Sequence, residues 1–138
     1  MLPDIFESMD YLQKGLQASQ LRADTLANNI ANVDTPGFKA SHVEFEAYMK
    51  QALEGESRLE PSDPDDGHEH IRRNATVDPA DVTPAVIQDT STTMRLDGNN
   101  VDIDNEMVQL AKNSIYYNTL VKKLNGEVTR LKLAIDGR

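Results

Sequence analysis

The sequence predicts a mainly α-helical protein in which long N- and C-terminal helices pair as an antiparallel coiled coil. Two observations support this fold class. Apolar residues recur at heptad spacing at both ends of the chain, and four prolines and most of the acidic residues lie between them. We therefore divide the chain into an N-terminal heptad helix and turn (1–39), an acidic middle segment (40–100) and a C-terminal heptad helix (101–138). The chain contains no cysteine, which excludes a disulfide framework.

The N-terminal helix is predicted from apolar positions that alternate in steps of four and three residues. Such spacing keeps one stripe of a helix facing a partner helix. Seven of the nine positions in this N-terminal seam are large and apolar. They are Ile5, Met9, Leu12, Leu16, Ser19, Ala23, Leu26, Ile30 and Val33.

The C-terminal helix shows the same rhythm over about four heptads. Asp102 or Asp104 is placed to cap its first amides, and Gly137 follows its last apolar seam residue. Only Ser114 is polar in this C-terminal seam. The seam comprises Ile103, Met107, Leu110, Ser114, Tyr117, Val121, Leu124, Val128, Leu131 and Ile135.

Two packing schemes remain open for these helices, which would reach roughly 40 to 50 Å. They can pair with each other, or each can pack into a helical bundle. Further apolar residues widen both stripes beyond what one partner helix covers, so either other subunits or the middle segment must cover them. These residues are Phe6, Leu21, Ile115, Tyr116, Leu120 and Leu133.

The middle segment is expected to contain a short helix over 43–54, because Phe45, Met49 and either Ala52 or Leu53 fall on one helical face. Residues 55–92 carry four prolines among many acids, a composition typical of an irregular, extended segment. Short strands are candidates over 82–88 and 93–96. The run Asp-Gly-Asn-Asn at 97–100 predicts a turn into the last helix.

Composition and charge exclude several classes of function. The 138 residues are 38% apolar and 5% aromatic, which is lean for an enzyme core. The net charge of −9 is distributed as −2 over 1–40, −8 over 41–100 and +1 over 101–138. Because no basic stripe is present, nucleic acid is excluded as a main partner. No apolar run is long enough to span a bilayer and no cleavable signal peptide is evident, so we expect no direct membrane insertion.

The acidic and histidine clusters of the middle segment do not fit a metal site. The run 63–67 superficially resembles a calcium loop, but Gly67 comes one position early and Asn74 replaces the bidentate glutamate. His68 and His70 are two residues apart, whereas zinc ligands on a helix are about four apart. We predict a solvated acidic loop, with no catalytic residue, metal or cofactor, and therefore no enzyme.

The end of the first helix carries a run rich in asparagine, 27–39. Pro36 disfavours a helical Thr35 and Gly37 permits a positive φ, so 35–38 is expected to be a sharp turn. Asn28, Asn29 and Asn32 precede it. Their amides suit bonding to the backbone of an adjoining chain, or they are simply solvated at an ordinary helix end.

The run 27–39 resembles the signature of the bacterial flagellar rod and hook proteins, and its Asp-Thr-Pro-Gly variant resembles that of the proximal rod. A second stretch, 97–107, resembles the same proximal rod family. The resemblance covers roughly 5–50 and 93–136. The matching positions are Asn28, Asn29, Asn32, Thr35, Pro36, Gly37 and Phe38 in the first motif, and Asp97, Gly98, Asn99, Val101, Asp102, Asp104 and Glu106 in the second.

This resemblance implies a structural subunit of the basal-body proximal rod, polymerising through its terminal helices into a helical tube needed for flagellum assembly and motility. It implies export by the flagellar type III apparatus without a cleaved signal peptide, and a periplasmic location. The implied partners are further copies, other rod proteins, a rod-base adaptor and the membrane ring. The alternative from another class is a soluble coiled-coil adaptor that forms a closed dimer.

Overall fold

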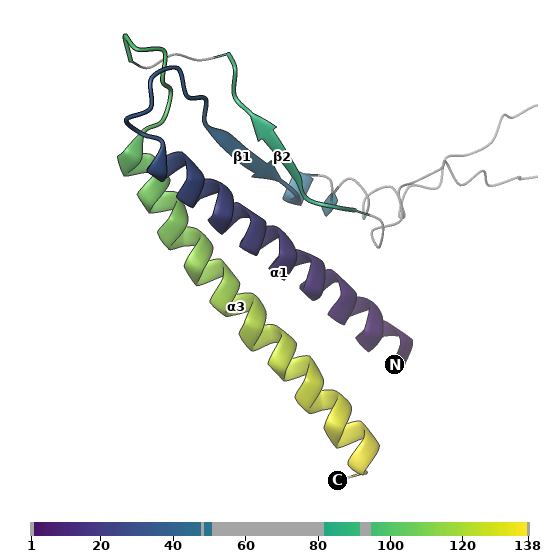
Figure 1. The fold of residues 1–138 in the computed structure, drawn as a ribbon. Helices are drawn as coiled ribbons and strands as arrows, with labels where there is room; N and C mark the ends of the chain where they lie inside the picture. The colour runs from purple at the N-terminus through teal and green to yellow at the C-terminus, as the bar shows by residue number, and fades with distance from the viewer. Residues whose placement is uncertain (1, 48, 51–81, 92–94, 138) are drawn as a thin grey trace, which may run out of the picture.

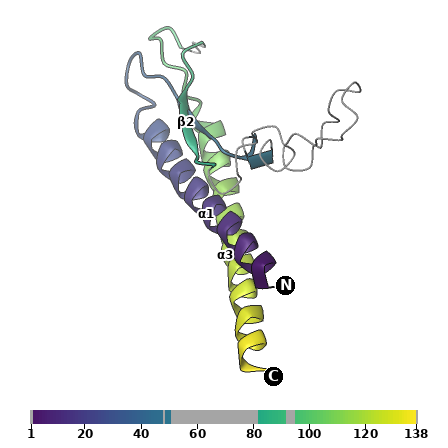
Figure 2. The same ribbon diagram turned by 90° about the vertical axis from the view of Figure 1, so that its right-hand side faces the viewer.

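The computed structural model describes residues 2–47, 49–50, 82–91 and 95–137. Two long helices dominate it, α1 (Leu2–Ala31) and α3 (Ile103–Asp136), with two short strands, β1 (Ser41–Glu44) and β2 (Ala85–Gln88). The helices lie antiparallel, with the end of α1 beside the start of α3, and they diverge toward the chain ends (Figures 1 and 2). The prediction of a mainly α-helical protein with long terminal helices is therefore confirmed.

Both ends of α3 match the capping signals. The Asp102 carboxylate accepts hydrogen bonds from the backbone N–H groups of Asp104 and Asn105, at 3.1 and 3.3 Å, which satisfies two of the unpaired amides of the first turn. Gly137 ends the helix with a φ of 64°. A residue with a Cβ is strained in this left-handed conformation, which explains the glycine.

The strands pair antiparallel, with Val43 opposite Val86, and lie against α1 on a different side from α3 (Figure 1). Beneath them Ala18, Phe45 and Val82 form a small buried apolar cluster, with Met49 packed against it. α1 therefore has partners on two sides, whereas within the described residues α3 packs mainly against α1.

The predicted helix over 43–54 is wrong at its start. Val43 and Glu44 belong to β1, and residues 46, 47, 49 and 50 are helical, while the remainder lies outside the described residues. The physical reason is an alternation of period two: Val43 and Phe45 are buried, while Glu44 and Glu46 are turned outward.

The strand expected over 82–88 is confirmed for its second half as β2. In the second candidate strand, residues 92–94 lie outside the described residues. Arg95 and Leu96 belong to a turn, in which the N–H of Gly98 donates to the carbonyl of Arg95 at 3.1 Å.

The described interior is as polar as it is apolar. Six apolar residues are buried, against seven polar or charged ones, and the largest fully buried side chains are Asn29, Asn99 and Ser19. Every buried side-chain polar atom among the described residues has a hydrogen-bond partner. Networks of this kind, when fully satisfied, specify one geometry rather than adding much net stability.

Candidate functional site

The two motif segments meet at the closed end of the helix pair, where each forms a turn. In the first turn the N–H of Phe38 donates to the Thr35 carbonyl at 3.3 Å, and Gly37 has a φ of 72°. The sharp turn predicted from Pro36 and Gly37 is thus confirmed. The Thr35 hydroxyl donates to the Asn32 side-chain oxygen at 3.2 Å, which ties the turn to the end of α1.

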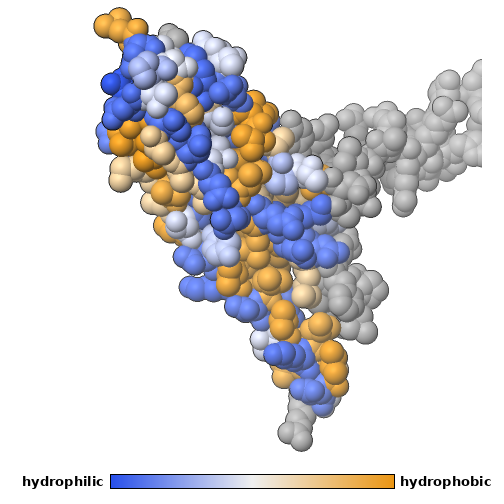
Figure 3. All heavy atoms as spheres, viewed as in Figure 1, coloured by the Kyte–Doolittle hydropathy of each residue, from blue (hydrophilic) through white to orange (hydrophobic). Residues whose placement is uncertain are grey.

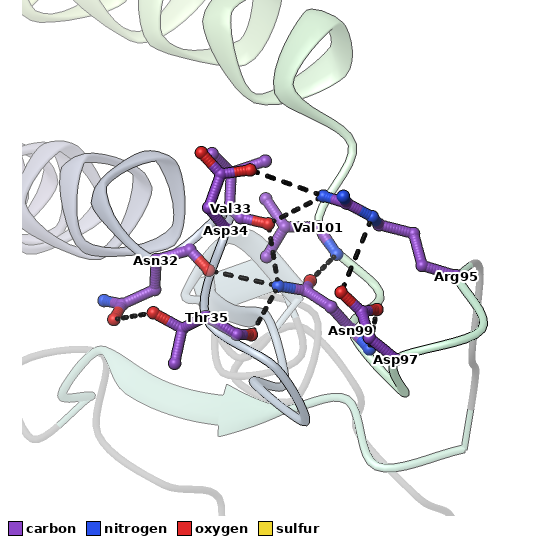
Figure 4. Close-up of polar contacts among 8 residues, drawn as sticks. All are labelled: Asn32, Val33, Asp34, Thr35, Arg95, Asp97, Asn99 and Val101. Carbon is purple, nitrogen blue, oxygen red and sulfur yellow. Dashed lines mark hydrogen bonds and ion pairs between the residues drawn. The ribbon is translucent and has the colours of Figure 1, made fainter.

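Asn99, from the second turn, joins the two turns (Figure 4). It is 0% exposed, and its Nδ2 donates to the backbone carbonyls of Asn32, Val33 and Thr35 at 2.9 to 3.0 Å. Its Oδ1 accepts from the N–H of Val101 at 2.7 Å. One side chain therefore bonds three carbonyls of the segment that follows α1, in addition to the turn bonds that the Asn32 and Thr35 carbonyls accept from backbone N–H groups.

Arg95 and Gly37 reinforce the same junction. The Nη1 of Arg95 donates to the Val33 carbonyl at 2.9 Å, and its guanidinium lies 3.7 Å from Asp34 and 3.8 Å from Asp97. The Gly37 N–H donates to the Asp97 carbonyl at 2.9 Å. We call this set of contacts between 32–38 and 95–101 the interlocked turns.

Two more buried asparagines connect the interlocked turns to the strands and helices. Asn29 accepts from the Ser41 N–H at 3.0 Å and donates to the Ser41 carbonyl at 2.7 Å, as a paired strand would, and it also donates to Glu106 of α3 at 3.0 Å. Asn100 accepts from the N–H of Ala40 at 2.7 Å and donates to the Asp89 carbonyl at 2.9 Å. The strand pair is thereby fixed relative to both helices.

A polar pair also fixes α3 against the middle of α1. The Ser19 hydroxyl donates to the Asn113 Oδ1 at 3.0 Å, and the Asn113 Nδ2 returns a bond to the Ser19 carbonyl at 2.8 Å. One turn away, Gly15 allows a close approach, because a Cβ built there would lie 3.3 Å from Leu120. A reciprocal buried pair of this kind specifies helix register. Beside it a pocket of about 270 Å³ lies between the helices, lined in part by Gln20.

This pair rotates α3 away from the predicted seam. Asn113 and Glu127 are buried toward α1 in place of their neighbours Ser114 and Val128. Five seam residues of α3 are exposed: Ile103, Met107, Ser114, Tyr117 and Ile135. The other seam residues whose side chains the structure describes are half-buried or buried, namely Met9, Leu12, Leu16, Ser19, Ala23, Leu26, Ile30, Val33, Leu110, Val121, Leu124, Val128 and Leu131.

Two of the three asparagines of the first motif bond groups of their own chain in the structure. Asn29 bonds Ser41 and Glu106, and Asn32 bonds the Asn28 carbonyl at 2.8 Å, so both amides serve their own chain. Asn28 is exposed. Exposed positions also include Thr35, Pro36, Asp102 and Asp104.

Sequence reasoning missed Arg95, Asn100 and Asn113 as members of these networks. For Asn100 a signal existed, since it directly follows Asn99 in the predicted turn. For Asn113, the sequence pattern predicted the neighbouring residue, Ser114, at the contact with α1. Only the hydrogen bonds to Ser19 show that Asn113 occupies this position.

Arg22 forms a charged contact on the side of α1 that faces the strands. Its guanidinium donates to Glu46 at 2.6 Å and to the Val43 carbonyl at 3.4 Å. Partial burial of Glu46 favours the neutral acid. The hydrogen bond and charge of Arg22, with a backbone hydrogen bond, outweigh that effect, so the pKa of Glu46 is lowered. Arg22 therefore acts as a clamp between α1 and β1.

Neither a metal site nor a membrane span is present in the part of the chain that the structure describes. The described residues contain no group of three histidine, cysteine or acidic side chains placed to hold a metal ion, and the cluster at His68 and His70 lies outside them. No described helix has the length and apolar character needed to cross a bilayer.

Comparison with known proteins identifies the class. Residues 9–39, which end in the first interlocked turn, match the family model described as "Flagella basal body rod protein". Relatives named flagellar basal body rod protein FlgB are similar over most of their length. The Bacillus subtilis protein is 35% identical over 126 residues, 91% of each chain. Those of Proteus mirabilis and Escherichia coli are 33% and 30% identical, covering 98% and 92% of the relative and 99% and 93% of this chain. The chain therefore belongs to the FlgB family of flagellar basal body rod proteins, structural components rather than enzymes.

Proposed function

We propose that this chain is a rod subunit that polymerises into the helical proximal rod of the flagellar basal body, and so is needed for flagellum assembly and motility. Membership of the rod protein family supports the structural role. The single observation that carries polymerisation is the apolar surface of α3. Eight of the ten exposed large apolar side chains among the described residues lie on this helix.

The energetic argument is that this surface is too large to leave in water. Ile115 is 69% exposed and Ile135 is 73% exposed, and apolar surface continues along the helices toward the chain ends (Figure 3). Burying one such side chain contributes about 1.5 to 3 kcal/mol. Contiguous exposed apolar surface of this kind marks interaction sites. Packing against other subunits buries apolar surface that the largely polar interior of one chain leaves exposed to water.

The two terminal helices act as one assembly domain in this proposal, and their heptad positions form coiled-coil contacts once neighbours are present. The interlocked turns, which contain most of the motif residues, hold the two helices in one geometry. The motif residues therefore promote assembly by contacts within the subunit, because these contacts hold the exposed apolar surface of α3 in a fixed geometry.

The proposal extends to location and partners. We place the subunit in the periplasmic rod, exported by the flagellar type III apparatus without cleavage. Its neighbours are further copies, other rod proteins, a rod-base adaptor and the membrane ring. Resemblance to the rod and hook proteins supports this assignment.

The test is complementation of a strain from which the gene for this chain is deleted. Met107→Asp places a charge on an exposed apolar position of α3, while Gln109→Asp adds the same charge at an exposed polar position two residues away. We expect Met107→Asp to abolish motility and rods in electron micrographs, with the circular dichroism of the purified subunit unchanged, and Gln109→Asp to retain both.

Two results would contradict this function. One is normal motility of the strain that carries Met107→Asp. The other is a closed dimer of the purified protein that persists at every concentration in sedimentation velocity, as expected of the coiled-coil adaptor.

A further inference from the structure

The face of α3 that points away from α1 has an apolar stripe among cations. Val108 and Ile115 are seven residues apart and Leu133 continues this stripe near the end of the helix, while the cation Lys122 lies seven residues after Ile115. All four are exposed. Lys112 lies beside them. We call this the outer face of α3.

Helix geometry places this face opposite the contact with α1. Asn113 bonds Ser19 at the interface, and Ile115 lies two residues further, about 200° around the helix. The outer face therefore lies on the far side of α3 and takes no part in the contact between α1 and α3.

The outer face of α3 is surrounded by positive charge, although the whole chain carries −9. Within α3, which the structure describes in full, residues 107–135 contain four lysines and one arginine and a single acid, Glu127. That acid is buried and accepts a hydrogen bond from Arg130 at 3.2 Å. The solvent-facing charge of this stretch is thus entirely basic.

A second outer face, on α1, has the opposite sign. Asp10, Gln17 and Asp24 recur at intervals of seven, with Gln13 between them, and these positions are exposed. Gln17 lies two residues from Ser19, so this face also points away from the helix pair's interface. We call these residues the outer face of α1.

The cations of α1 do not reach its outer face. The Lys14 ammonium donates to the Val82 carbonyl at 3.0 Å, and Arg22 is paired with Glu46. Both basic side chains are therefore turned toward the strands, and the outer face retains only its two carboxylates and the glutamines.

We infer that the outer face of α3 in one subunit binds the outer face of α1 in a second copy of this chain. The inference rests on the proposed function and specifies which surfaces meet. Charge complementarity and reach support it. Asp10 and Asp24 are about 21 Å apart along α1, and Lys112 and Lys122 are about 15 Å apart along α3, at 1.5 Å per residue, which long lysine side chains can bridge. The stems of the glutamines cover the stripe of Val108 and Ile115.

Such a contact joins unlike faces on opposite sides of one subunit. It therefore repeats from copy to copy and gives a ring or a helix rather than a closed pair. Contacts between like faces would place Lys112 and Lys122, or Asp10 and Asp24, against their own copies, and like-charge juxtaposition disfavours them. The charge pattern thus selects an open assembly over a two-fold dimer.

Crosslinking tests the contact directly, because the chain contains no cysteine. Gln17→Cys and Ile115→Cys are introduced together in the complemented deletion strain, and cells are treated with a flexible bismaleimide. We expect a ladder of covalent oligomers of this chain that extends beyond the dimer. Each single-cysteine variant is the control and should give no ladder.

Three outcomes overturn the inference: motile cells without crosslinks, products that stop at the dimer, and products that contain only a different protein. None of these affects the proposed function. That function fails instead if the unaltered chain does not restore rods to the deletion strain, so the two failures are distinguishable.

Charge exchange tests the contact without cysteines. We expect Lys112→Glu with Lys122→Glu to reduce swarm expansion about tenfold, since like charges across the contact weaken association. Adding Asp10→Lys and Asp24→Lys should restore it. Lys132→Glu is the matched control, because it lies about 100° around α3 from Ile115 and should have no effect. Failure of the exchange to restore expansion overturns the inference.

Discussion

Asn99 offers the sharpest test of the interlocked turns, because a single side chain holds them together. Asn99→Ala removes the donor to three carbonyls and the acceptor for the Val101 N–H. Val101 is buried, so its N–H is left without a partner and without water. Val33 keeps the bond from Arg95.

The expected cost follows from these bonds. One buried unpaired N–H costs about 1 to 3 kcal/mol, and each further lost hydrogen bond contributes about 1 kcal/mol. Because each of the three carbonyls keeps another donor, namely the Thr35 N–H, Arg95 or the Phe38 N–H, we expect a loss of about 2 to 4 kcal/mol in the free energy of unfolding. That is a large share of the roughly 5 to 15 kcal/mol typical of a folded domain.

Urea unfolding followed by circular dichroism at the helix band measures this loss. The midpoint of Asn99→Ala should fall by about 1 to 2 M. Leu96→Ala is the control on the same turn, since Leu96 is 112% exposed and should change stability by no more than about 0.5 kcal/mol. Equal midpoints for Asn99→Ala and the unaltered protein would refute the assignment of Asn99 as the link between the turns.

A charged variant refines the same test. Asn99→Asp keeps the acceptor for Val101 but turns a carboxylate toward three carbonyl oxygens. The folded state then favours the protonated acid, which raises the pKa of the introduced carboxyl group. Relative to the unaltered protein at the same pH, the variant should be more destabilised at pH 7 than below about 3.9, where the acid is protonated in both states. A pH-independent difference would contradict this account.

Three further predictions follow from local geometry. Gly98→Ala should cost about 1 to 2 kcal/mol, because Gly98 has a φ of 83°, whereas Gly126→Ala, in an exposed helical position, should add about 0.5 to 1 kcal/mol; equal effects in urea would contradict this. Gly15→Leu should force α3 away from α1 and cost about 1 to 3 kcal/mol of unfolding free energy, and an unchanged thermal midpoint would refute the close approach. Since the pKa of Glu46 is lowered in the folded state, its contribution is present above the ordinary pKa and lost as pH falls through the folded value; Arg22→Gln should flatten this part of the acid titration of stability, and an unaltered profile would count against the clamp.

The pattern of residues by itself determined the long helices, their caps and the turns. These features depend on neighbours in the chain, so heptad spacing, the Asp102 cap, Pro36 and Gly37 predict them from local rules alone. The family resemblance rested on the same local runs. The acidic charge of the middle segment was plain from composition, which gave only a net charge of +1 over 101–138.

Tertiary structure decided how the faces of the helices are used. Heptad spacing defines a stripe but not its rotation, and a reciprocal bond between Ser19 and Asn113 turned α3 by about one residue from the expected seam. Likewise the sequence places Asn99 in a turn, but only the structure shows that its side chain donates to three carbonyls 64 to 67 residues away along the chain. Hydrogen bonds between distant segments are short-ranged and directional, so they depend on coordinates that no local pattern contains.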